Sequence, residues 1–161
     1  MQIVERLGGA GRVVACDRSE EKLTPIRRTI AARRLENVTA CLASEVAAAA
    51  PAGGFDAALV DAPCSNTGVL ARRPEARWRL RPEHIAELAR VQTGVLEQAA
   101  ALVRAGGRLV YSTCSLQREE NEGVVEALAA RRAAWRVERS SLTLPLSDHD
   151  GAFWALLVKG V

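Results

Sequence analysis

Two cysteines stand in polar segments that each follow an apolar run, a pattern typical of strand ends. Cys64 belongs to Asp61-Ala62-Pro63-Cys64-Ser65, which follows residues 55–60, and Cys114 belongs to Ser112-Thr113-Cys114-Ser115, which follows residues 108–111. Open α/β sheets place reactive side chains at such strand ends. A cysteine thiolate is a nucleophile, and Pro, Ser and Thr rather than aliphatic residues flank both cysteines. We therefore expect one reactive site built from two loops.

The remaining cysteines and the histidines indicate neither disulfide nor metal chemistry. The cysteine spacing is unlike that of a small secreted scaffold and no signal peptide is recognisable, which predicts a cytoplasmic protein with reduced thiols. No Cys-x-x-Cys occurs, and His84 and His149 lie at no ligand spacing from a cysteine, so we expect no metal. Cys16 and Cys41 lie in apolar runs and are expected to be core residues. No apolar run is long enough to cross a bilayer, so no membrane contact is expected.

The composition is that of a folded α/β protein. A chain of 161 residues fits one domain with a substantial core. With 48% hydrophobic, 25% charged and only 4% aromatic residues, it resembles helices packed on a sheet. The net charge of +3 permits contact with phosphates without requiring it.

The predicted elements alternate between helices and strands. We predict helices at residues 2–7, 19–34, 44–50, 82–104 and 119–133, and strands at 12–17, 38–42, 55–61, 108–113, 135–138 and 152–159. A long loop is predicted over 62–81, and the last two strands are expected to form an antiparallel pair. This alternation predicts a largely parallel sheet that binds ligands at the carboxyl ends of its strands.

Asp17 stands at the end of the first predicted strand. In α/β cofactor domains an acidic residue at this position binds the ribose of the cofactor, because its carboxylate accepts hydrogen bonds from both ribose hydroxyls. The alternative is that Asp17 only caps the helix that starts near Ser19.

A set of longer motifs carries a family resemblance. These motifs are Asp61 to Leu70, Arg72-Arg73-Pro74, Arg77-Trp78, Ser112-Thr113-Cys114-Ser115, Glu119-Glu120-Asn121-Glu122 and Asp150 to Trp154. They resemble the RNA cytosine-5 methyltransferases, which include the Sun/Fmu-type 16S ribosomal RNA enzymes and the NOL1/NOP2/Sun proteins. The resemblance implies a single Rossmann-like, S-adenosylmethionine-dependent catalytic domain over residues 1–161, with an antiparallel C-terminal strand, acting on RNA and above all on ribosomal RNA.

The resemblance also implies a role for each site residue. Cys114 is the nucleophile that adds to cytosine C6 and makes C5 able to attack a methyl group. Asp61 contacts cytosine N3 and supplies a proton there, and Cys64 assists the release of Cys114 after methyl transfer. The cofactor contacts implied are Asp17, Arg18, Ser44 and Asp61. Ser44 stands where the family has an acidic residue against adenine, with Glu45 the nearest carboxylate.

The chain departs from the family pattern at its start. The resemblance implies that it begins after the family's first strand and the Pro-Gly-Gly-Lys loop that follows. The missing strand normally lies between those ending at Asp17 and Asp61. Its absence is expected to leave unpaired backbone groups or to force these strands together, and a second copy could compensate in an oligomer.

The resemblance also implies that the family's N-terminal RNA-binding domain is absent, so any RNA affinity is expected to come from the catalytic domain. A basic loop with one aromatic residue is the candidate contact, and the alternative is a solvated charged loop. Its members are Arg72, Arg73, Arg77, Trp78, Arg79 and Arg81. Two rival functions remain: a catalytically silent module that binds RNA or a partner, and a small-molecule or protein methyltransferase of the same fold. The paired thiol motifs argue against the second rival, because simple N- or O-methylation needs no thiol.

Overall fold

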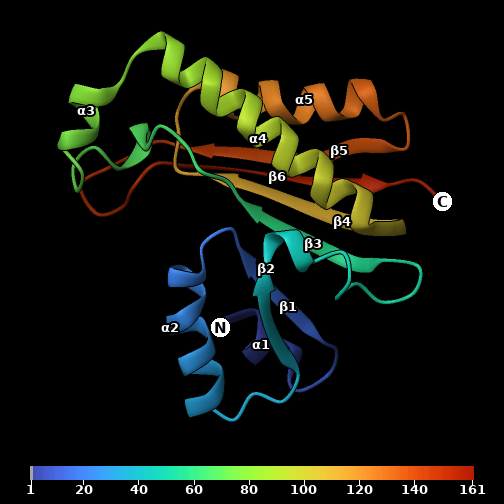
Figure 1. Ribbon diagram of the computed structural model, residues 1–161. Helices are drawn as coiled ribbons and strands as arrows, with labels where there is room; N and C mark the ends of the chain where they lie inside the picture. Colours follow the sequence, from blue (N-terminus) through green and yellow to red (C-terminus); the bar gives the residue numbers. More distant parts are fainter. Residues whose placement is uncertain (1) are drawn as a thin grey trace. The chain divides into compact units, whose positions relative to one another are not determined.

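The computed structural model describes residues 2–161 except for the side chain of Arg79, and the chain divides into two compact units (Figure 1). The N-terminal unit ends at Ala52 and the C-terminal unit begins at Gly53. A single catalytic domain over the whole chain stays a prediction.

The N-terminal unit is built on a parallel pair of strands. It contains α1 (Gln2–Leu7), β1 (Val13–Asp17), α2 (Glu20–Ala32), β2 (Val38–Leu42) and the 3-10 turn η1 (Ala43–Glu45). β1 and β2 pair with Val13 opposite Val38 and Asp17 opposite Leu42. α2 packs on this pair and buries Leu23 completely. The strands predicted at 12–17 and 38–42 are confirmed.

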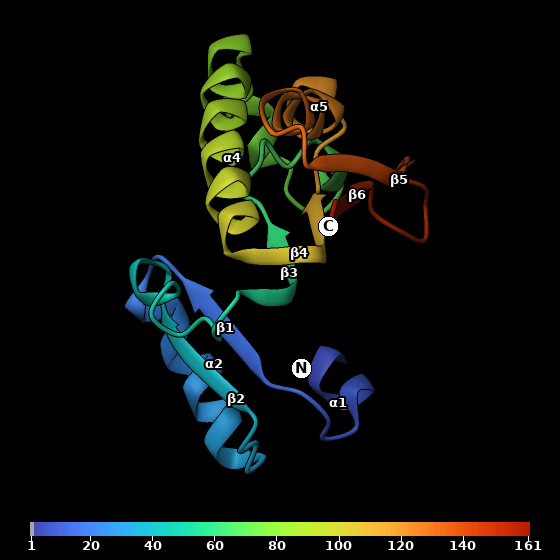
Figure 2. The ribbon, with the colours of Figure 1, turned by 90° about the vertical axis from the view of Figure 1, so that its right-hand side faces the viewer.

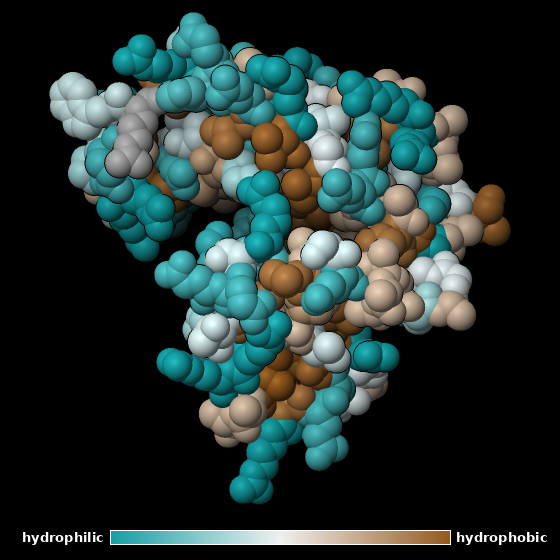
Figure 3. All heavy atoms as spheres, viewed as in Figure 1, coloured by the Kyte–Doolittle hydropathy of each residue, from teal (hydrophilic) through white to brown (hydrophobic). Residues whose placement is uncertain are grey.

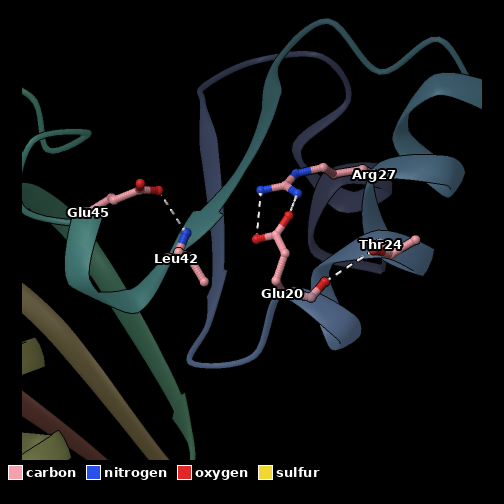
Figure 4. Close-up of polar contacts among 5 residues, drawn as sticks. All are labelled: Glu20, Thr24, Arg27, Leu42 and Glu45. Carbon is pink, nitrogen blue, oxygen red and sulfur yellow. Dashed lines mark hydrogen bonds and ion pairs between the residues drawn. The ribbon is translucent and has the colours of Figure 1, made fainter.

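The helix predicted at 44–50 is wrong, because only η1 and a run of turns form there. A segment this short is marginal as a helix without tertiary support. The carboxylate of Glu45 accepts a hydrogen bond from the Leu42 N–H at 3.1 Å, which closes the turn after β2 (Figure 4). On the first half of α2, Glu20 pairs with Arg27, and the Thr24 hydroxyl donates to the Glu20 carbonyl at 3.1 Å. These contacts are exposed, so the ion pair adds little to stability.

The C-terminal unit is a four-stranded sheet with two long helices on one face (Figures 1 and 2). Its strand order is β3-β4-β6-β5, with β3 and β4 parallel and the other two pairings antiparallel. Its elements are β3 (Phe55–Asp61), η2 (Thr67–Val69), α3 (Glu75–Arg79), α4 (Pro82–Leu102), β4 (Val103–Thr113), η3 (Arg118–Glu120), α5 (Glu122–Arg131), β5 (Trp135–Thr143) and β6 (Ala152–Lys159). Among the helices of residues 2–161, none combines the length and apolar character needed to span a membrane.

The core of this unit lies between the sheet and the two helices. Alternate residues of β4 and β6 point into it, and Tyr111 meets Phe153 edge to face with ring centroids 6.4 Å apart. Leu96 of α4 and Leu128 of α5 are fully buried against them. Burying a large apolar side chain stabilises the fold by about 1.5–3 kcal/mol. This core therefore holds β3 and β4 in place, together with the loops that follow them.

The boundary between α4 and β4 differs from the prediction. The helix ends at Leu102 rather than 104, and the strand starts at Val103 rather than 108. Gly106 has a φ of 72°, and the register with β3 shifts between Phe55 and Ala57. Gly106 therefore lies at an irregularity in the strand, where a positive φ suits glycine.

Three further predictions change in length. The helix predicted at 119–133 is interrupted at Asn121, because its side chain accepts from the Thr113 hydroxyl at 2.6 Å and donates to the Ser115 carbonyl at 2.9 Å. The loop predicted at 62–81 contains η2 and α3. β5 continues to Thr143 because it pairs with the whole length of β6, and this pairing confirms the antiparallel C-terminal strand.

The strands form two sheets, one of β1 and β2 and one of the other four. β1 and β3 share no hydrogen-bonded ladder, so each has a strand neighbour on one side only within residues 2–161. Cys41 is buried as predicted, whereas Cys16 is exposed because β1 lies at a sheet edge; its prediction as a core residue is wrong.

Candidate active site

Parallel pairing of β3 with β4 brings the two cysteine loops together. Asp61 lies opposite Ser112, and the Ala62 N–H extends the ladder by donating to the Ser112 carbonyl at 3.0 Å. Both strands end within three residues of a cysteine, and the sulfurs of Cys64 and Cys114 are 3.1 Å apart. The structure thus places the predicted residues Asp61, Cys64 and Cys114 at one edge of the sheet.

The side chain of Asn66 spans the two cysteines. Its Nδ2 donates to the Cys64 carbonyl at 2.9 Å, and its Oδ1 accepts from the Cys114 thiol at 3.1 Å. Asn66 adopts the left-handed conformation, with φ of 61°, which asparagine tolerates better than most residues. The tight turn after Cys64 therefore depends on this residue.

A buried carboxylate ties the two loops to each other. Glu120 is fully buried, and its Oε1 accepts from the Ser65 N–H and from the Gln92 amide, both at 2.9 Å. Its Oε2 accepts from the hydroxyls of Ser65 and Ser115. Its backbone carbonyl accepts from the Tyr111 hydroxyl at 2.6 Å. Four donors thus saturate a carboxylate that links the Cys64 loop, the Cys114 loop and α4.

Sequence reasoning gave no role to Glu120 or Gln92, although a signal for Gln92 exists. On α4 it occupies a stripe with Leu88, Leu96 and Ala100, at spacings of four residues. A glutamine in an otherwise apolar stripe faces the core and needs buried partners, which here are Glu120 and the Pro63 carbonyl at 2.8 Å.

The two thiols differ in their tendency to ionise. The hydrogen bond donated by Cys64 lowers the pKa of Cys114 to about 7, and the positive charge of Arg73 adds to this effect. Burial and the charge of Asp61 act in the opposite direction. The same hydrogen bond, followed by burial, raises the pKa of Cys64 above its ordinary value. Cys114 is therefore the more acidic thiol of the pair: while protonated it donates to Asn66 Oδ1, and once ionised it accepts from Cys64.

This asymmetry predicts the pH dependence of alkylation. Below pH 7 both sulfurs are protonated, and as pH rises through about 7 Cys114 becomes a thiolate, so its alkylation by iodoacetamide should reach half its maximal rate there. At pH 7, the thiolate fraction of a thiol of pKa 7 is about 50 times that of a thiol of pKa 9. Because the thiolate of lower pKa is the weaker nucleophile, the expected advantage in alkylation rate is about sixfold. Peptide mapping after limited alkylation measures both sites. Equal labelling of Cys64 and Cys114 at pH 7 would contradict the assignment.

A pocket of about 430 Å³ opens beside the thiols, within the range of small-ligand sites. The loop after Cys64, the α3 region and the first half of α4 line it: Cys64, Ser65, Asn66, Arg73, Glu75, Ala76, Leu80, His84, Glu87, Leu88 and Val91. Figure 3 shows apolar side chains gathered over the middle of α4, beside hydrophilic ones. The pocket thus offers apolar walls, a cationic side chain and a thiol to one ligand.

The predicted basic loop lies partly at this pocket. Arg73 lines it, Trp78 is 83% exposed, and Arg77 and Arg81 are exposed. Arg72 is paired with Asp150, with Nε and Oδ1 3.3 Å apart. The side chain of Arg79 lies outside the described residues. RNA contact by this loop stays a prediction, which the placement of Arg73 and Trp78 favours.

The other predicted cofactor residues, Asp17, Arg18 and Ser44, belong to the N-terminal unit. Asp17 Oδ1 accepts from the Ser19 N–H at 2.9 Å, which closes a turn just before α2, whereas the helix itself has no side-chain cap at Ser19. Lys22 Nζ approaches Asp17 Oδ2 at 3.8 Å. Because a carboxylate has about four acceptor positions, these contacts leave room for a ribose hydroxyl pair. Arg18 and Ser44 are exposed.

Close packing of backbone at Gly68 predicts a clear substitution effect. Its N–H donates to the Cys114 carbonyl at 2.9 Å and its carbonyl accepts from Gly151 at 2.8 Å. A Cβ at this position would collide with the Gly151 carbonyl and lie 2.9 Å from the Cys114 oxygen. Gly68→Ala should therefore lower the free energy of unfolding by about 1–3 kcal/mol.

Gly94 on α4 provides the matched control, because a Cβ there meets nothing within 4 Å. Gly94→Ala should raise the free energy of unfolding by up to about 1 kcal/mol through helix propensity. Urea denaturation of both variants tests the pair, and changes of the same sign would show that the crowding at Gly68 is not real.

Comparison with known proteins identifies the family. The solved structures that the chain resembles are methyltransferases of Rossmann-like fold, which is the class that its fold defines. The family model described as 16S rRNA methyltransferase RsmB/F matches residues 2–152, and the chain belongs to this family. The family resemblance derived from the motifs is thereby confirmed.

Individual relatives agree with this membership. Ribosomal RNA small subunit methyltransferase F of Klebsiella pneumoniae is 36% identical over 99% of this chain and 33% of its own length. Ribosomal RNA small subunit methyltransferase B of Vibrio vulnificus is 35% identical over 98% of this chain and 38% of its own. The crystal structure of NSun6 from Pyrococcus horikoshii with SFG matches with a TM-score of 0.80 at 30% identity, over 98% of this chain and 44% of that one. The chain thus spans about a third of the curated relatives it matches.

Proposed function

We propose that this chain carries the catalytic residues of an S-adenosylmethionine-dependent RNA cytosine-5 methyltransferase, with ribosomal RNA as its substrate and Cys114 as its nucleophile. The observation that carries the proposal is the pair of sulfurs 3.1 Å apart, one of which has its pKa lowered to about 7. Relatives named for methylation of small-subunit ribosomal RNA support the substrate. Action on ribosomal RNA would place the protein in the cytoplasm.

Cytosine C5 is too weak a nucleophile to take a methyl group directly, so the ring must first be activated. The Cys114 thiolate adds to C6, and the displaced electron pair develops as charge toward N3. Asp61, which is exposed at the end of β3, supplies a hydrogen bond and a proton at N3. C5 then carries the electron density that the reaction needs.

Release of the product calls for the second cysteine. Once C5 carries the methyl group, a general base takes the C5 proton, the electron pair of that C–H bond restores the C5–C6 double bond, and the bond between C6 and the Cys114 sulfur breaks to leave a thiolate. In this proposal Cys64 is the donor in the 3.1 Å contact between the two sulfurs, so it stabilises the departing thiolate. This contact is the physical reason for a release role at Cys64.

S-adenosylmethionine, when bound, supplies a methyl group on a positively charged sulfur. The solved NSun6 structure contains SFG, an analogue of this cofactor. Within the N-terminal unit Asp17, Arg18 and Ser44 stay the proposed cofactor contacts, and within the C-terminal unit Asp61 does. The acceptor positions left on Asp17 fit a ribose hydroxyl pair.

Substrate contact is proposed at the pocket beside Cys64. Its apolar walls from α4 suit a flat base, and Arg73 suits a phosphate. The exposed Trp78 offers a stacking surface at the same loop.

The test is transfer of a labelled methyl group to small-subunit ribosomal RNA by the full chain, followed by digestion to nucleosides. Label in 5-methylcytidine, absent with Cys114→Ala, supports the proposal. Label in any other nucleoside would overturn the cytosine C5 chemistry. A calorimetric titration with S-adenosylmethionine accompanies the assay, and a folded chain that binds RNA but not the cofactor would instead be the silent binding module.

A further inference from the structure

The sulfurs of Cys64 and Cys114 lie close enough to form a disulfide, a spacing that methyl transfer alone does not require. They are 3.1 Å apart, and both cysteines are free. A disulfide has a sulfur–sulfur length of about 2.05 Å, so closing the gap needs a relative movement of about 1 Å. Several backbone and side-chain hydrogen bonds hold the two loops at this spacing, including those of Glu120 and Gly68.

The two thiols also differ in the way that reactive dithiols do, with one more nucleophilic thiol beside a second thiol. Cys114 has the lowered pKa and is the better nucleophile, and Cys64 is a thiol in direct contact with it. Cys64 lines a pocket of about 430 Å³ and both cysteines are half-buried, so a small oxidant has access. A resolving thiol at this distance would capture an oxidised Cys114 before further oxidation.

We propose that Cys64 and Cys114 form a redox site at which a hydroperoxide produces a reversible disulfide that stops methyl transfer. The disulfide forms without RNA or cofactor, and only its effect on methyl transfer rests on the proposed function. Closing the bond consumes the attacking sulfur of Cys114, so the oxidised protein has no nucleophile for cytosine C6.

The chemistry balances over two steps. The Cys114 thiolate attacks the terminal oxygen of the hydroperoxide, the O–O bond breaks, the sulfur becomes a sulfenic acid, and the departing alkoxide takes a proton from water to leave as an alcohol. The Cys64 sulfur then attacks the Cys114 sulfur, the S–O bond breaks, and water leaves with the Cys64 proton. Two electrons pass from the two sulfurs to the peroxide. A dithiol reductant returns them by thiol–disulfide exchange.

The remaining cysteines provide an internal control. β1 and β2 bring Cys16 into register with Cys41, so these two are the competing pair within the chain. Burial raises the pKa of Cys41, and partial desolvation also raises the pKa of Cys16 although that residue is exposed, so both hold less thiolate at neutral pH. Selective oxidation at Cys64 and Cys114 is therefore the expected result.

The experiment treats the folded chain with hydrogen peroxide at pH 7, blocks free thiols, and maps linked peptides by mass spectrometry. The expected product is a peptide pair joined through Cys64 and Cys114, formed about tenfold faster than any oxidation at Cys16 and reversed by dithiothreitol. Cys64→Ala should stop at a sulfenic acid on Cys114 that dimedone traps, and Cys114→Ala should give neither product. The double variant Cys16→Ser, Cys41→Ser should form the disulfide unchanged.

Oxidation spread equally over four cysteines, a Cys16–Cys41 linkage alone, or no linkage in the folded wild-type chain would overturn the proposal. The wild-type mapping decides even where a variant fails to fold. Methyl transfer assayed before and after oxidation separates the two proposals. A disulfide in a chain without methyl transfer contradicts only the proposed function, and methyl transfer that survives complete disulfide formation contradicts the inhibition.

Discussion

Cys64→Ala is expected to accumulate a covalent protein–RNA adduct, whereas Cys114→Ala should form none. Without the Cys64 thiol, the Cys114 sulfur loses the hydrogen bond that is the main cause of its lowered pKa. A sulfur of higher pKa is a poorer leaving group, so departure from C6 slows more than methyl transfer does. Turnover should fall by about 10²–10⁴, the usual contribution of a positioned proton donor or acceptor.

The measurement is a denaturing gel of each variant after incubation with cytosine-containing RNA and S-adenosylmethionine. The double variant Cys64→Ala, Cys114→Ala is the matched control and should form no adduct. Cys16→Ala, at an exposed thiol on β1, controls for nonspecific thiol chemistry and should behave as wild type. Equal adduct from both single variants, or none from either, would exclude the mechanism.

Glu120→Ala is expected to lower the free energy of unfolding by about 3 kcal/mol, because each buried donor left without an acceptor costs about 1–3 kcal/mol. The Ser65 N–H would lose the acceptor it has at 2.9 Å, and Gln92 would lose one of its two. The hydroxyls of Ser65 and Ser115 keep each other at 3.2 Å, which limits the loss. Urea denaturation measures the change.

Glu119→Gln is the matched control, since Glu119 is exposed and precedes Glu120 directly. It should change stability by less than about 0.5 kcal/mol. Glu120→Gln keeps the shape of the side chain but replaces one acceptor by a donor facing hydroxyls, so its loss should be intermediate. In the Glu120→Ala variant the Cys64 loop and the Cys114 loop should also separate. Alkylation of Cys114 at pH 7 should then slow toward that of an ordinary thiol. Equal stability of the Glu120→Ala and Glu119→Gln variants would show that Glu120 does not hold the loops together.

Prediction from sequence succeeded where the cause is local. The strands at 38–42, 55–61 and 152–159 have the predicted bounds, because short apolar runs between turn residues carry their own signal. It failed at the start of β4, where pairing across the sheet turned an expected helix end into a bulged strand. It also failed at Asn121, where buried hydrogen bonds to Thr113 and Ser115 outweigh the helical preference of the segment.

The same division holds at the site. The sequence by itself determined which residues were candidates, because two cysteines after strand-like runs imply loops at one edge of a parallel sheet. Only the tertiary structure decided that their sulfurs are 3.1 Å apart and that this contact lowers the pKa of Cys114 and raises that of Cys64. It alone revealed Glu120, whose partners Ser65 and Gln92 stand 55 and 28 positions away. A buried carboxylate is stabilised by donors that the fold assembles from distant segments, and neither periodicity nor spacing along the chain records which donors those will be.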